Sequence, residues 1–262
     1  QEAATNTNRS IAGSLEKLST GLKINKASDD ASGLAIADKL RTQVTSINQG
    51  ISNGNSAIAL LQITDKSMAE QSKILDTIKS KLIQANTDTT STAGRTAIAK
   101  DVTKLLQQLN NIGEQTNYNG TTLLQKARTT ADASKEGNLT AARTAKGGLS
   151  FQIGEGTADL ITTRTINSNV AGLKLSALAK AVRSGAKVSA GATAATTGVF
   201  TRTMAQSGQK AIDKAITTLN GYRGDIGSTQ NQVESAVRNL MTQATNIKNA
   251  ESVIRDVDYA EE

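Results

Sequence analysis

The chain has 262 residues and a formal net charge of +7, and it contains no Cys, His, Trp or Pro. Catalysis by Ser–His–Asp or Cys–His relays and zinc binding through His or Cys are therefore excluded. Only three Tyr and two Phe are present, too few for a module that stacks bases on aromatic rings, so we predict no nucleic-acid binding. No apolar run approaches the roughly 18 residues of a membrane-spanning helix, so no membrane partner is expected.

The first twenty residues are polar and lack the apolar centre of a signal peptide. The chain begins with Gln1 rather than Met, which is consistent with a processed or trimmed chain. Ile11, Leu15, Leu18 and Leu22 recur at helical spacing and predict a short helix. Because few other apolar residues surround it, its apolar side is either covered by another subunit or belongs to a frayed terminus.

The stretch KASDDASGLAIADKL, residues 26–40, places Asp29 and Asp30 directly before an apolar-periodic segment. Paired carboxylates could serve acid–base chemistry or bind a divalent cation. They could also accept hydrogen bonds from the free N–H groups of a helix start, where the helix dipole favours negative charge. Acidic residues are common at helix starts and nothing else in the stretch suggests a catalytic pocket, so the second interpretation is favoured.

A long helix is predicted from about Asp30 to Asn86. Apolar residues recur every seven positions, with Gly54 in one slot of the row, and a companion row contains Val44, Ile51 and Ile58, the pattern of a coiled-coil-like helix. After the turn cluster NTDTTSTAG, a second helix is expected from about Ala93 to Glu114. The short loop predicts antiparallel packing of the two helices. The segment TNYNG, residues 116–120, then predicts a tight turn.

Residues 125–203 are rich in Ala, Thr, Ser and Gly. The segments LSFQIGEG and LITTRTI alternate in part between β-branched and polar residues, which predicts a small β-hairpin. The segment SGAKVSAGATAATTGV has little to bury and reads as loop or weak strand.

The last segment predicts a helix of about fifty residues, with apolar residues at seven-residue steps from Ile212 to Ile254. Gly221, Gly224 and Gly227 lie inside it and indicate a local kink or a close helix contact. We therefore expect a mainly α fold, an elongated bundle of long coiled-coil-like helices from the N- and C-terminal thirds with a small β-hairpin region in the middle. The predicted core rows contain Leu40, Ile47, Leu61, Met68, Leu75, Ile98, Leu105, Ile112, Ile212, Leu219, Ile226, Val233, Leu240, Ile247 and Ile254.

Several motifs resemble the two terminal signatures of bacterial flagellins. They are LSTGLKINKASDDASGLAIADKLRTQ, NSAIALLQITDKSM and NYNGTTLL in the first half, and LNGYRGDIGSTQNQVESAVRNL and AESVIRDVDYAEE at the other end. The resemblance covers about residues 8–127 and 205–262, in the right order. KILDTIK and FQIGEG are most similar to flagellins of the epsilon-proteobacterial kind.

The resemblance implies a subunit of the flagellar filament, exported by the flagellar type III system without a cleavable signal peptide and polymerised outside the cell for motility. It implies four segments: 1–28, a remnant of the inner-tube helix with its connection; 29–127, the N-terminal rod helices; 128–204, a β-rich variable region facing outward; and 205–262, the C-terminal rod helix. The family's extreme termini are only partly present, so the chain as given is expected to be monomeric or weakly associated.

The implied partners are other flagellin subunits, the flagellar cap and hook-junction proteins, and an export chaperone. Binding to the innate immune flagellin receptor is expected to be weak or absent, because Thr77 and Lys81 stand where receptor-binding flagellins carry an arginine and a leucine. No enzyme activity, cofactor or metal is expected. Polar residues outside the apolar rows are the predicted subunit interface: Asp29, Asp30, Arg41, Gln43, Asn48, Asn53, Asn55 and Asn231. The alternative assignment is the hook–filament junction protein, a flagellin paralogue.

Overall fold

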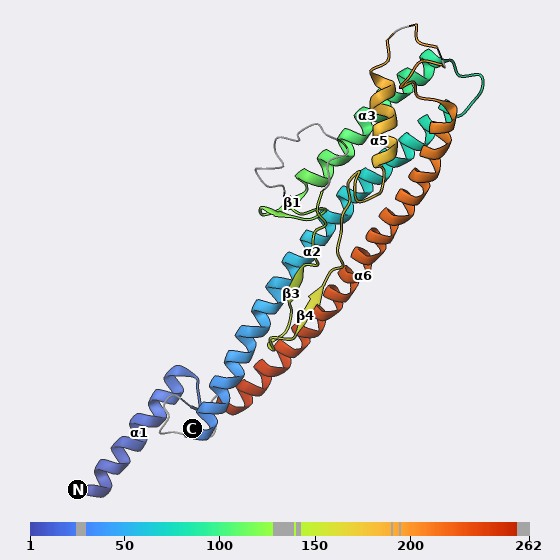
Figure 1. Cartoon of the computed structure of the whole chain (residues 1–262). Coiled ribbons are helices and arrows are strands. Elements are labelled where there is room, and N and C mark those ends of the chain that lie inside the picture. Colours follow the sequence, from blue (N-terminus) through green and yellow to red (C-terminus); the bar gives the residue numbers. More distant parts are fainter. Residues whose placement is uncertain (25–29, 128–138, 140–142, 190, 194, 256–262) are drawn as a thin grey trace. The chain divides into compact units, whose positions relative to one another are not determined.

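The computed structural model describes residues 1–24, 30–127, 139, 143–189, 191–193 and 195–255. Five helices lie within these residues: α1 (Glu2–Thr20), α2 (Ala31–Ala85), α3 (Thr92–Gln115), α5 (Ser176–Ala186) and α6 (Arg202–Arg255) (Figure 1). The strands are short: β1 (Asn117–Tyr118), β2 (Thr121–Thr122), β3 (Ser150–Gln152) and β4 (Leu160–Thr162). The prediction of a mainly α chain, with long helices from both terminal thirds and a small hairpin in the middle, is confirmed.

The chain divides into two compact units. Unit 1 contains residues 1–57, 151–161 and 232–262, and unit 2 contains residues 58–150 and 162–231. Each unit includes a part of α2 and a part of α6. The four segments expected from the sequence describe roles in a filament rather than compact units, and they remain predictions.

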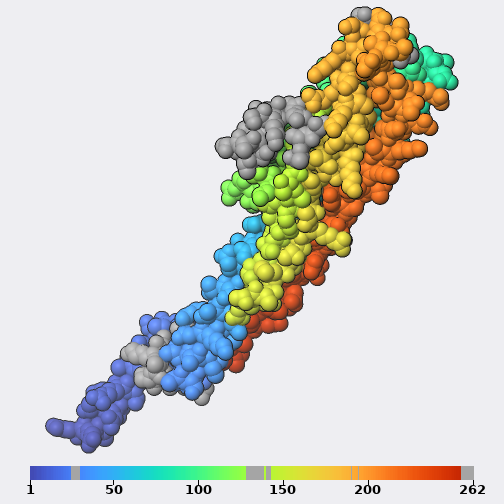
Figure 2. Space-filling view, viewed as in Figure 1, coloured from blue at the N-terminus to red at the C-terminus, as the bar shows by residue number. Residues whose placement is uncertain are grey.

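In unit 1 the first part of α2 packs against the last part of α6. Val44 and Ile47 from α2, and Val233, Val237 and Leu240 from α6, are buried. The strand pair β3–β4 adds buried Ile153 and Ile161, and in Figure 2 this yellow-green segment lies over α2 and α6. The unit therefore closes its two-helix core with a hairpin, which supplies the third side that two helices alone lack.

Unit 2 contains the larger core. The second part of α2 runs beside the first part of α6, where Gly208 of α6 faces Leu82 of α2. Helix α3 follows the 86–91 loop and packs against α5. The fully buried side chains of this unit include Leu61, Met68, Leu75, Ile78, Leu82, Leu106, Leu109 and Phe200.

The 86–91 loop is held by side chains that satisfy the free carbonyl groups at the end of α2. Arg95 donates from Nε to the carbonyl of Ala85 at 2.9 Å and from Nη2 to that of Thr87 at 2.8 Å. Ser91 caps α3, because its Oγ accepts the N–H of Gly94 at 3.0 Å. These contacts replace the helical bonds that the chain loses where one helix ends and the next begins.

The TNYNG segment forms a two-residue hairpin turn between β1 and β2. Tyr118 pairs with Thr121, and the turn residues Asn119 and Gly120 have φ angles of 52° and 84°. Two successive positive φ angles are the signature of the turn that matches strand twist, which Asn and Gly tolerate best.

The predicted core rows are buried over most of their length. Leu40, Leu105, Ile112, Ile247 and Ile254 are half-buried, and the other ten positions are buried. On α3, Ile98, Val102 and Leu109 are buried as the spacing predicts, whereas Leu106 and Gly113 are buried in place of their neighbours Leu105 and Ile112. A straight α-helix has 3.6 residues per turn, so its buried face drifts away from a strict seven-residue repeat.

Two sequence expectations were wrong. Helix α5 lies in the segment expected to be β-rich, where Leu178, Ala179, Val182 and Gly185 form its buried face. Gly221, Gly224 and Gly227 make no close helix contact, because a Cβ added at any of them would meet nothing within 4 Å. These three glycines lie on an open side of α6, and the helix continues through them.

Candidate functional site

The described residues assemble no evident reaction centre. No group of three or more Asp or Glu side chains lies close enough to hold a metal ion among the residues with described positions. None of the helices described is long and apolar enough to cross a membrane. The candidate site is therefore sought on the surfaces and in the contacts that shape them.

Asp30 is the residue that starts α2. Its Oδ1 accepts the N–H of Gly33 at 2.9 Å, and its carbonyl accepts the N–H of Leu34 at 2.8 Å. The first contact satisfies one of the free donors at the helix start, and the negative charge also faces the positive end of the helix dipole. The structure thus gives Asp30 a capping role, while its predicted partner Asp29 lies outside the described residues.

The remaining predicted interface residues fall on unit 1 or at the end of unit 2. Arg41, Asn48, Asn55 and Asn231 are exposed, and Arg41 forms a 2.7 Å ion pair with Asp38 on its own helix. Gln43 is half-buried and lines a groove. These side chains point to solvent in a single chain, which leaves their predicted role in subunit contact open to test.

Asn53 has a different position from its neighbours in that set. Its side-chain nitrogen donates to the carbonyl oxygen of Gln152 in β3 at 2.9 Å, and its Oδ1 accepts from Gln49 at 2.9 Å. Both contacts lie within the chain, so Asn53 ties the hairpin to α2. Its side chain therefore positions the hairpin, and its role in contact between subunits remains a prediction.

Two glycines of α2 allow the hairpin and α6 to approach closely. A Cβ at Gly50 would lie 2.5 Å from the carbonyl oxygen of Ile153, and a Cβ at Gly54 would overlap with Val237 of α6. Any larger residue at either position must displace backbone or buried side chains. The slot that Gly54 occupies in the apolar row is therefore a contact point between elements.

The loop between β3 and β4, residues 154–159, carries Glu155 and Asp159, and we call it the acidic tip. Its conformation is fixed from within: Gln152 Nε2 donates to the carbonyls of Gly154 and Gly156 at 2.7 and 2.6 Å, and Asp159 Oδ2 accepts the N–H of Gly156 at 2.8 Å. Glu155 and Asp159 are both exposed. The tip thus presents two carboxylates on a preformed loop.

Beside the tip, unit 1 has a groove of about 630 Å³ lined by α2, the hairpin and α6. Its wall includes Ile47, Ile153 and Leu240, and Leu160 at its edge is 46% exposed. Its polar lining consists of amides and the two carboxylates of the tip. Such a lining suits contact with another protein surface better than chemistry on a small molecule.

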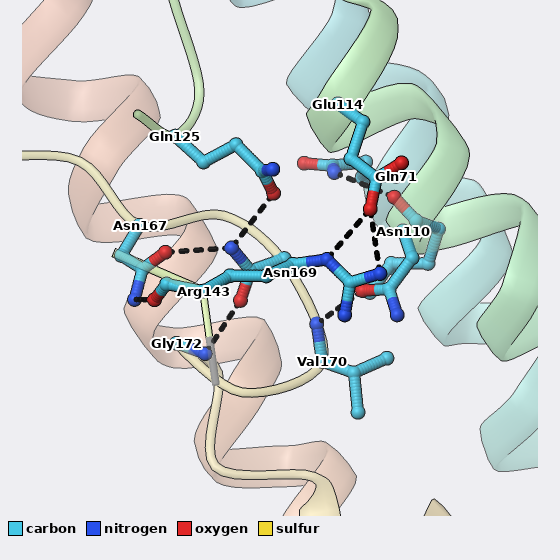
Figure 3. A network of polar contacts seen from close by, with 10 residues as sticks. Gln71, Asn110, Glu114, Gln125, Arg143, Asn167, Asn169, Val170 and Gly172 are labelled. Carbon is cyan, nitrogen blue, oxygen red and sulfur yellow. Dashed lines mark hydrogen bonds and ion pairs between the residues drawn. The ribbon is translucent and has the colours of Figure 1, made fainter. Parts of the chain in front are cut away.

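Unit 2 contains a buried polar network that holds residues 167–175 against α2 and α3 (Figure 3). Gln71 of α2 donates to the carbonyls of Leu109 and Ser168 at 3.1 and 2.9 Å, and it accepts from the Ser168 hydroxyl. Asn110 Oδ1 accepts the N–H of Val170 at 2.9 Å. Buried polar groups cost free energy unless they are paired, so this network specifies one path for the segment.

The same network extends to a charged pair. Asn169 donates to Gln125 at 2.9 Å and accepts the N–H of Gly172 at 2.7 Å. Arg143 Nε donates to Glu114 Oε1 at 2.7 Å, and only 7% of the Arg143 side chain is exposed. The pair joins α3 to the chain that precedes β3, and its burial reduces the screening of the attraction between the two charges by solvent.

Further ion pairs in unit 2 link α2 with α6. Lys79 lies 2.7 Å from Asp213, and Arg223 Nε donates to Asp65 at 3.0 Å. Arg223 belongs to the Arg-Gly-Asp tripeptide of the sequence, which lies within helix α6 rather than on a loop. The tripeptide is used in helix packing, and its helical conformation does not fit a loop-type adhesion motif.

A second groove, of about 900 Å³, lies entirely in unit 2. We call it the lysine groove, because Lys174, Lys210 and Lys214 line it and all three are exposed. Its one carboxylate, Asp213, is already paired with Lys79. Lys174 has a φ of 58°, a left-handed conformation that is unfavourable for a residue with a side chain and persists only where the surroundings fix it.

Sequence reasoning missed the polar network and the two grooves. Gln71 and Asn110 lie on buried helix faces. In the sequence, a polar residue there only interrupts the apolar row and does not indicate its hydrogen-bond partner. Their partners, Ser168 to Gly172, lie in the 128–204 segment, which was expected to be a β-rich region facing outward. The one available signal was Gln71 itself, a polar residue between apolar neighbours on the buried side of α2.

The chain is similar to flagellins over both of its ends. The profile described as the bacterial flagellin N-terminal helical region matches residues 1–129, and that of the bacterial flagellin C-terminal helical region matches residues 209–262. Flagellin A of Helicobacter felis is 54% identical over 121 residues, which are 46% of this chain and 24% of the relative. Flagellin FlaB2 of Treponema pallidum is 29% identical over 265 residues, covering 100% of this chain and 84% of the relative. The match thus spans about a quarter of the Helicobacter relative.

Two solved structures share the fold. The flagellin of Bacillus cereus aligns with a TM-score of 0.51 at 22% identity, over 76% of this chain and 94% of that one. A protein assigned as flagellar hook-associated, from Vibrio parahaemolyticus, aligns with a TM-score of 0.64 at 15% identity, over 87% and 99%. At these identities the likeness concerns the fold alone, and it does not separate the two kinds of flagellar protein.

Proposed function

The chain belongs to the bacterial flagellin family, and we propose that it is a structural subunit of the flagellar filament. The observation that carries this proposal is the pair of family profiles, which match in the right order at the two ends of the chain. The helices support it, because α2 and α6 present long helical surfaces, and side-by-side packing of such surfaces is how helical subunits assemble.

The role we propose is structural rather than catalytic. A filament subunit needs surfaces that repeat in every copy, and it needs no reacting group. We propose that the protein leaves the cell through the flagellar export apparatus, with an export chaperone as its partner before export. The flagellar cap and the hook-junction proteins are its proposed partners at the filament ends, and the extracellular filament is its proposed location.

The alternative is the hook–filament junction protein, and a seeded polymerisation assay separates the two. Full-length protein is added to sheared filament seeds and, separately, to isolated hooks, and growth is followed by electron microscopy. A filament subunit extends the seeds into long filaments. Binding that stops after a short layer on hook ends, without extension of seeds, would refute the proposal and establish the junction protein.

We also propose weak recognition by the innate immune flagellin receptor. Thr77 and Lys81 occupy the positions where the family resemblance expects an arginine and a leucine. The Thr77 hydroxyl donates to its own helix at the carbonyl of Lys73, and Lys81 contacts Asp101 of α3 at 3.2 Å. In a receptor reporter assay the wild-type chain should give a weak signal, and Thr77→Arg with Lys81→Leu should raise it. Strong activation by the wild-type chain would refute this expectation.

A further inference from the structure

The charges of the chain are divided unequally between the two units. The residue range of unit 2 contains 21 Lys and Arg against 10 Asp and Glu, a net charge of +11, whereas that of unit 1 contains 9 and 13, a net charge of −4. Four of the acidic residues of unit 1 lie in 256–262, outside the described residues. Contact between two copies of unit 2 would bring like charge together, whereas contact of unit 2 with unit 1 would join opposite charges.

The positive charge of unit 2 includes a defined concave surface. The lysine groove brings together Lys174, from the turn before α5, and Lys210 and Lys214, one helical turn apart on α6. Its carboxylate is neutralised by Lys79, so the groove has an excess of ammonium groups. The Lys174 N–H donates to the carbonyl of Ala171 at 3.1 Å. In the same segment Asn110 and Asn169 accept the N–H groups of Val170 and of Gly172, which also lines the groove. The network of Figure 3 therefore fixes one wall of the groove.

Unit 1 presents an exposed surface of opposite charge at the edge of its own groove. The acidic tip carries Glu155 and Asp159 on a loop whose backbone is fixed by Gln152 and by Asp159 itself. Because the loop is already ordered, little conformational entropy is lost when it binds. Among the described residues, no Lys or Arg is recorded within ion-pair distance of either carboxylate.

We propose that the acidic tip of one copy docks in the lysine groove of a second copy. This inference rests on the proposed filament function and names the surfaces and the partner that would serve it. The contact is head-to-tail, because the tip belongs to unit 1 and the groove to unit 2. A contact between two different surfaces of the same protein does not close as a two-fold dimer; it gives an open helical filament where the rotation between copies does not close a ring, which is the assembly that the proposed function requires.

The test is a charge-reversal series measured in seeded polymerisation of the full-length protein on its own filament seeds. The groove variant is Lys210→Glu with Lys214→Glu. The tip variant combines Glu155→Lys, which reverses one charge, with Asp159→Asn. The asparagine removes the second negative charge but keeps an acceptor oxygen for the Gly156 N–H. The matched control is Lys100→Glu with Lys104→Glu, two exposed lysines of α3 in the same unit. All variants are first compared with wild type by circular dichroism.

The groove variant and the tip variant should each elongate seeds at least about tenfold more slowly than wild type at low salt, and the difference should shrink as salt screens the charges. The control should stay within about twofold of wild type, although it changes the net charge of unit 2 equally. Combining the groove and tip variants should restore much of the rate, because the tip then carries one positive charge and the groove an excess of negative charge.

Equal slowing of the groove variant and the control would show that only bulk charge matters and would overturn the proposal. Wild-type rates in the groove and tip variants would overturn it as well. In both cases wild-type protein still extends seeds, so the proposed function survives. Wild-type protein that extends no seeds refutes the proposed function and this inference with it.

Discussion

The side-chain nitrogen of Gln71 lies 2.9 Å from the carbonyl oxygen of Ser168, a residue 97 positions further along the chain, and the Ser168 hydroxyl donates back to Gln71 Oε1. Both residues are fully buried. The reciprocal contact fastens the segment before α5 to the middle of α2. It belongs to the same network as the contact of Asn169 with Gly172, a residue that lines the lysine groove, so the position of one groove wall depends on it.

Replacing Gln71 with leucine should destabilise the chain by about 2–4 kcal/mol. The substitution keeps most of the side-chain volume but leaves the buried carbonyl and hydroxyl of Ser168 without their partner, and each such group costs about 1–3 kcal/mol. Gln62→Leu is the matched control, because Gln62 is an exposed residue of the same helix and should change stability by less than about 0.5 kcal/mol. Urea unfolding followed by circular dichroism measures the free energy of unfolding of both variants. Equal losses would show that the contacts of Gln71 do not stabilise the fold.

The Glu114–Arg143 pair should show a larger coupling energy than the exposed pair Glu70–Lys73. The side chains of the first pair are 21% and 7% exposed, against 61% and 73% in the second. Solvent and salt weaken an exposed pair to about 0–0.5 kcal/mol, whereas a hydrogen bond between charged groups away from solvent is expected to give about 1.5–3 kcal/mol. Double-mutant cycles with alanine at both pairs measure the difference. Similar couplings in the two cycles would contradict the interpretation of Arg143 as a structural anchor.

The helices were predictable from the sequence because their signal is repeated many times. The structure begins α2 at Ala31 and ends it at Ala85, within a residue of the expected bounds, since each turn of a long helix adds another apolar contact to the same row. The cap at Asp30 followed from its position before that row. The proline-free composition gave no reason to divide these helices, and they are continuous.

The remaining features depend on contacts between segments far apart in the sequence. Asn53 lies outside the apolar rows, so the sequence predicts a surface residue. Its hydrogen bond to Gln152 joins positions 99 residues apart, and no local pattern indicates such a contact. Helix α5 has 11 residues, too few for a periodic pattern to exceed the surrounding Ala and Thr, and its stability comes from packing on α3. The two glycines differ as their positions in the heptad suggest: Gly54 occupies a slot of the apolar row and packs closely, whereas Gly224 lies off the row of α6 and on an open helix side.

That difference between two glycines is directly testable. Gly54→Ala would place a methyl group into Val237, and overpacking of this kind costs about 1–3 kcal/mol, more than the gain of up to about 1 kcal/mol from higher helix propensity. Gly224→Ala meets open space and should stabilise the chain by about 0.5–1 kcal/mol. Thermal unfolding of the two variants should therefore shift in opposite directions. A rise in melting temperature for both would show that α2 and α6 are not in close contact at Gly54.

Asp30 tests whether the acidic pair of the SDD stretch acts as a helix start. Asp30→Ala removes the acceptor for the Gly33 N–H and should cost about 1 kcal/mol, within the range of about 0.5–2 kcal/mol for loss of a helix cap. Asp30→Asn retains an acceptor oxygen without the charge, so it should recover most of the loss, and the remainder measures the helix-dipole contribution of about 0.3–1 kcal/mol. Chemical denaturation at low and high salt separates the two effects, because salt screens the dipole contribution but leaves the hydrogen bond. Asp38→Ala, two turns later on the same helix, is the control for a general loss of acidic charge. If Asp30→Ala is as stable as wild type, or if Asp30→Asn is as unstable as Asp30→Ala, the capping role is wrong and a role for this carboxylate in contact between subunits becomes the better explanation.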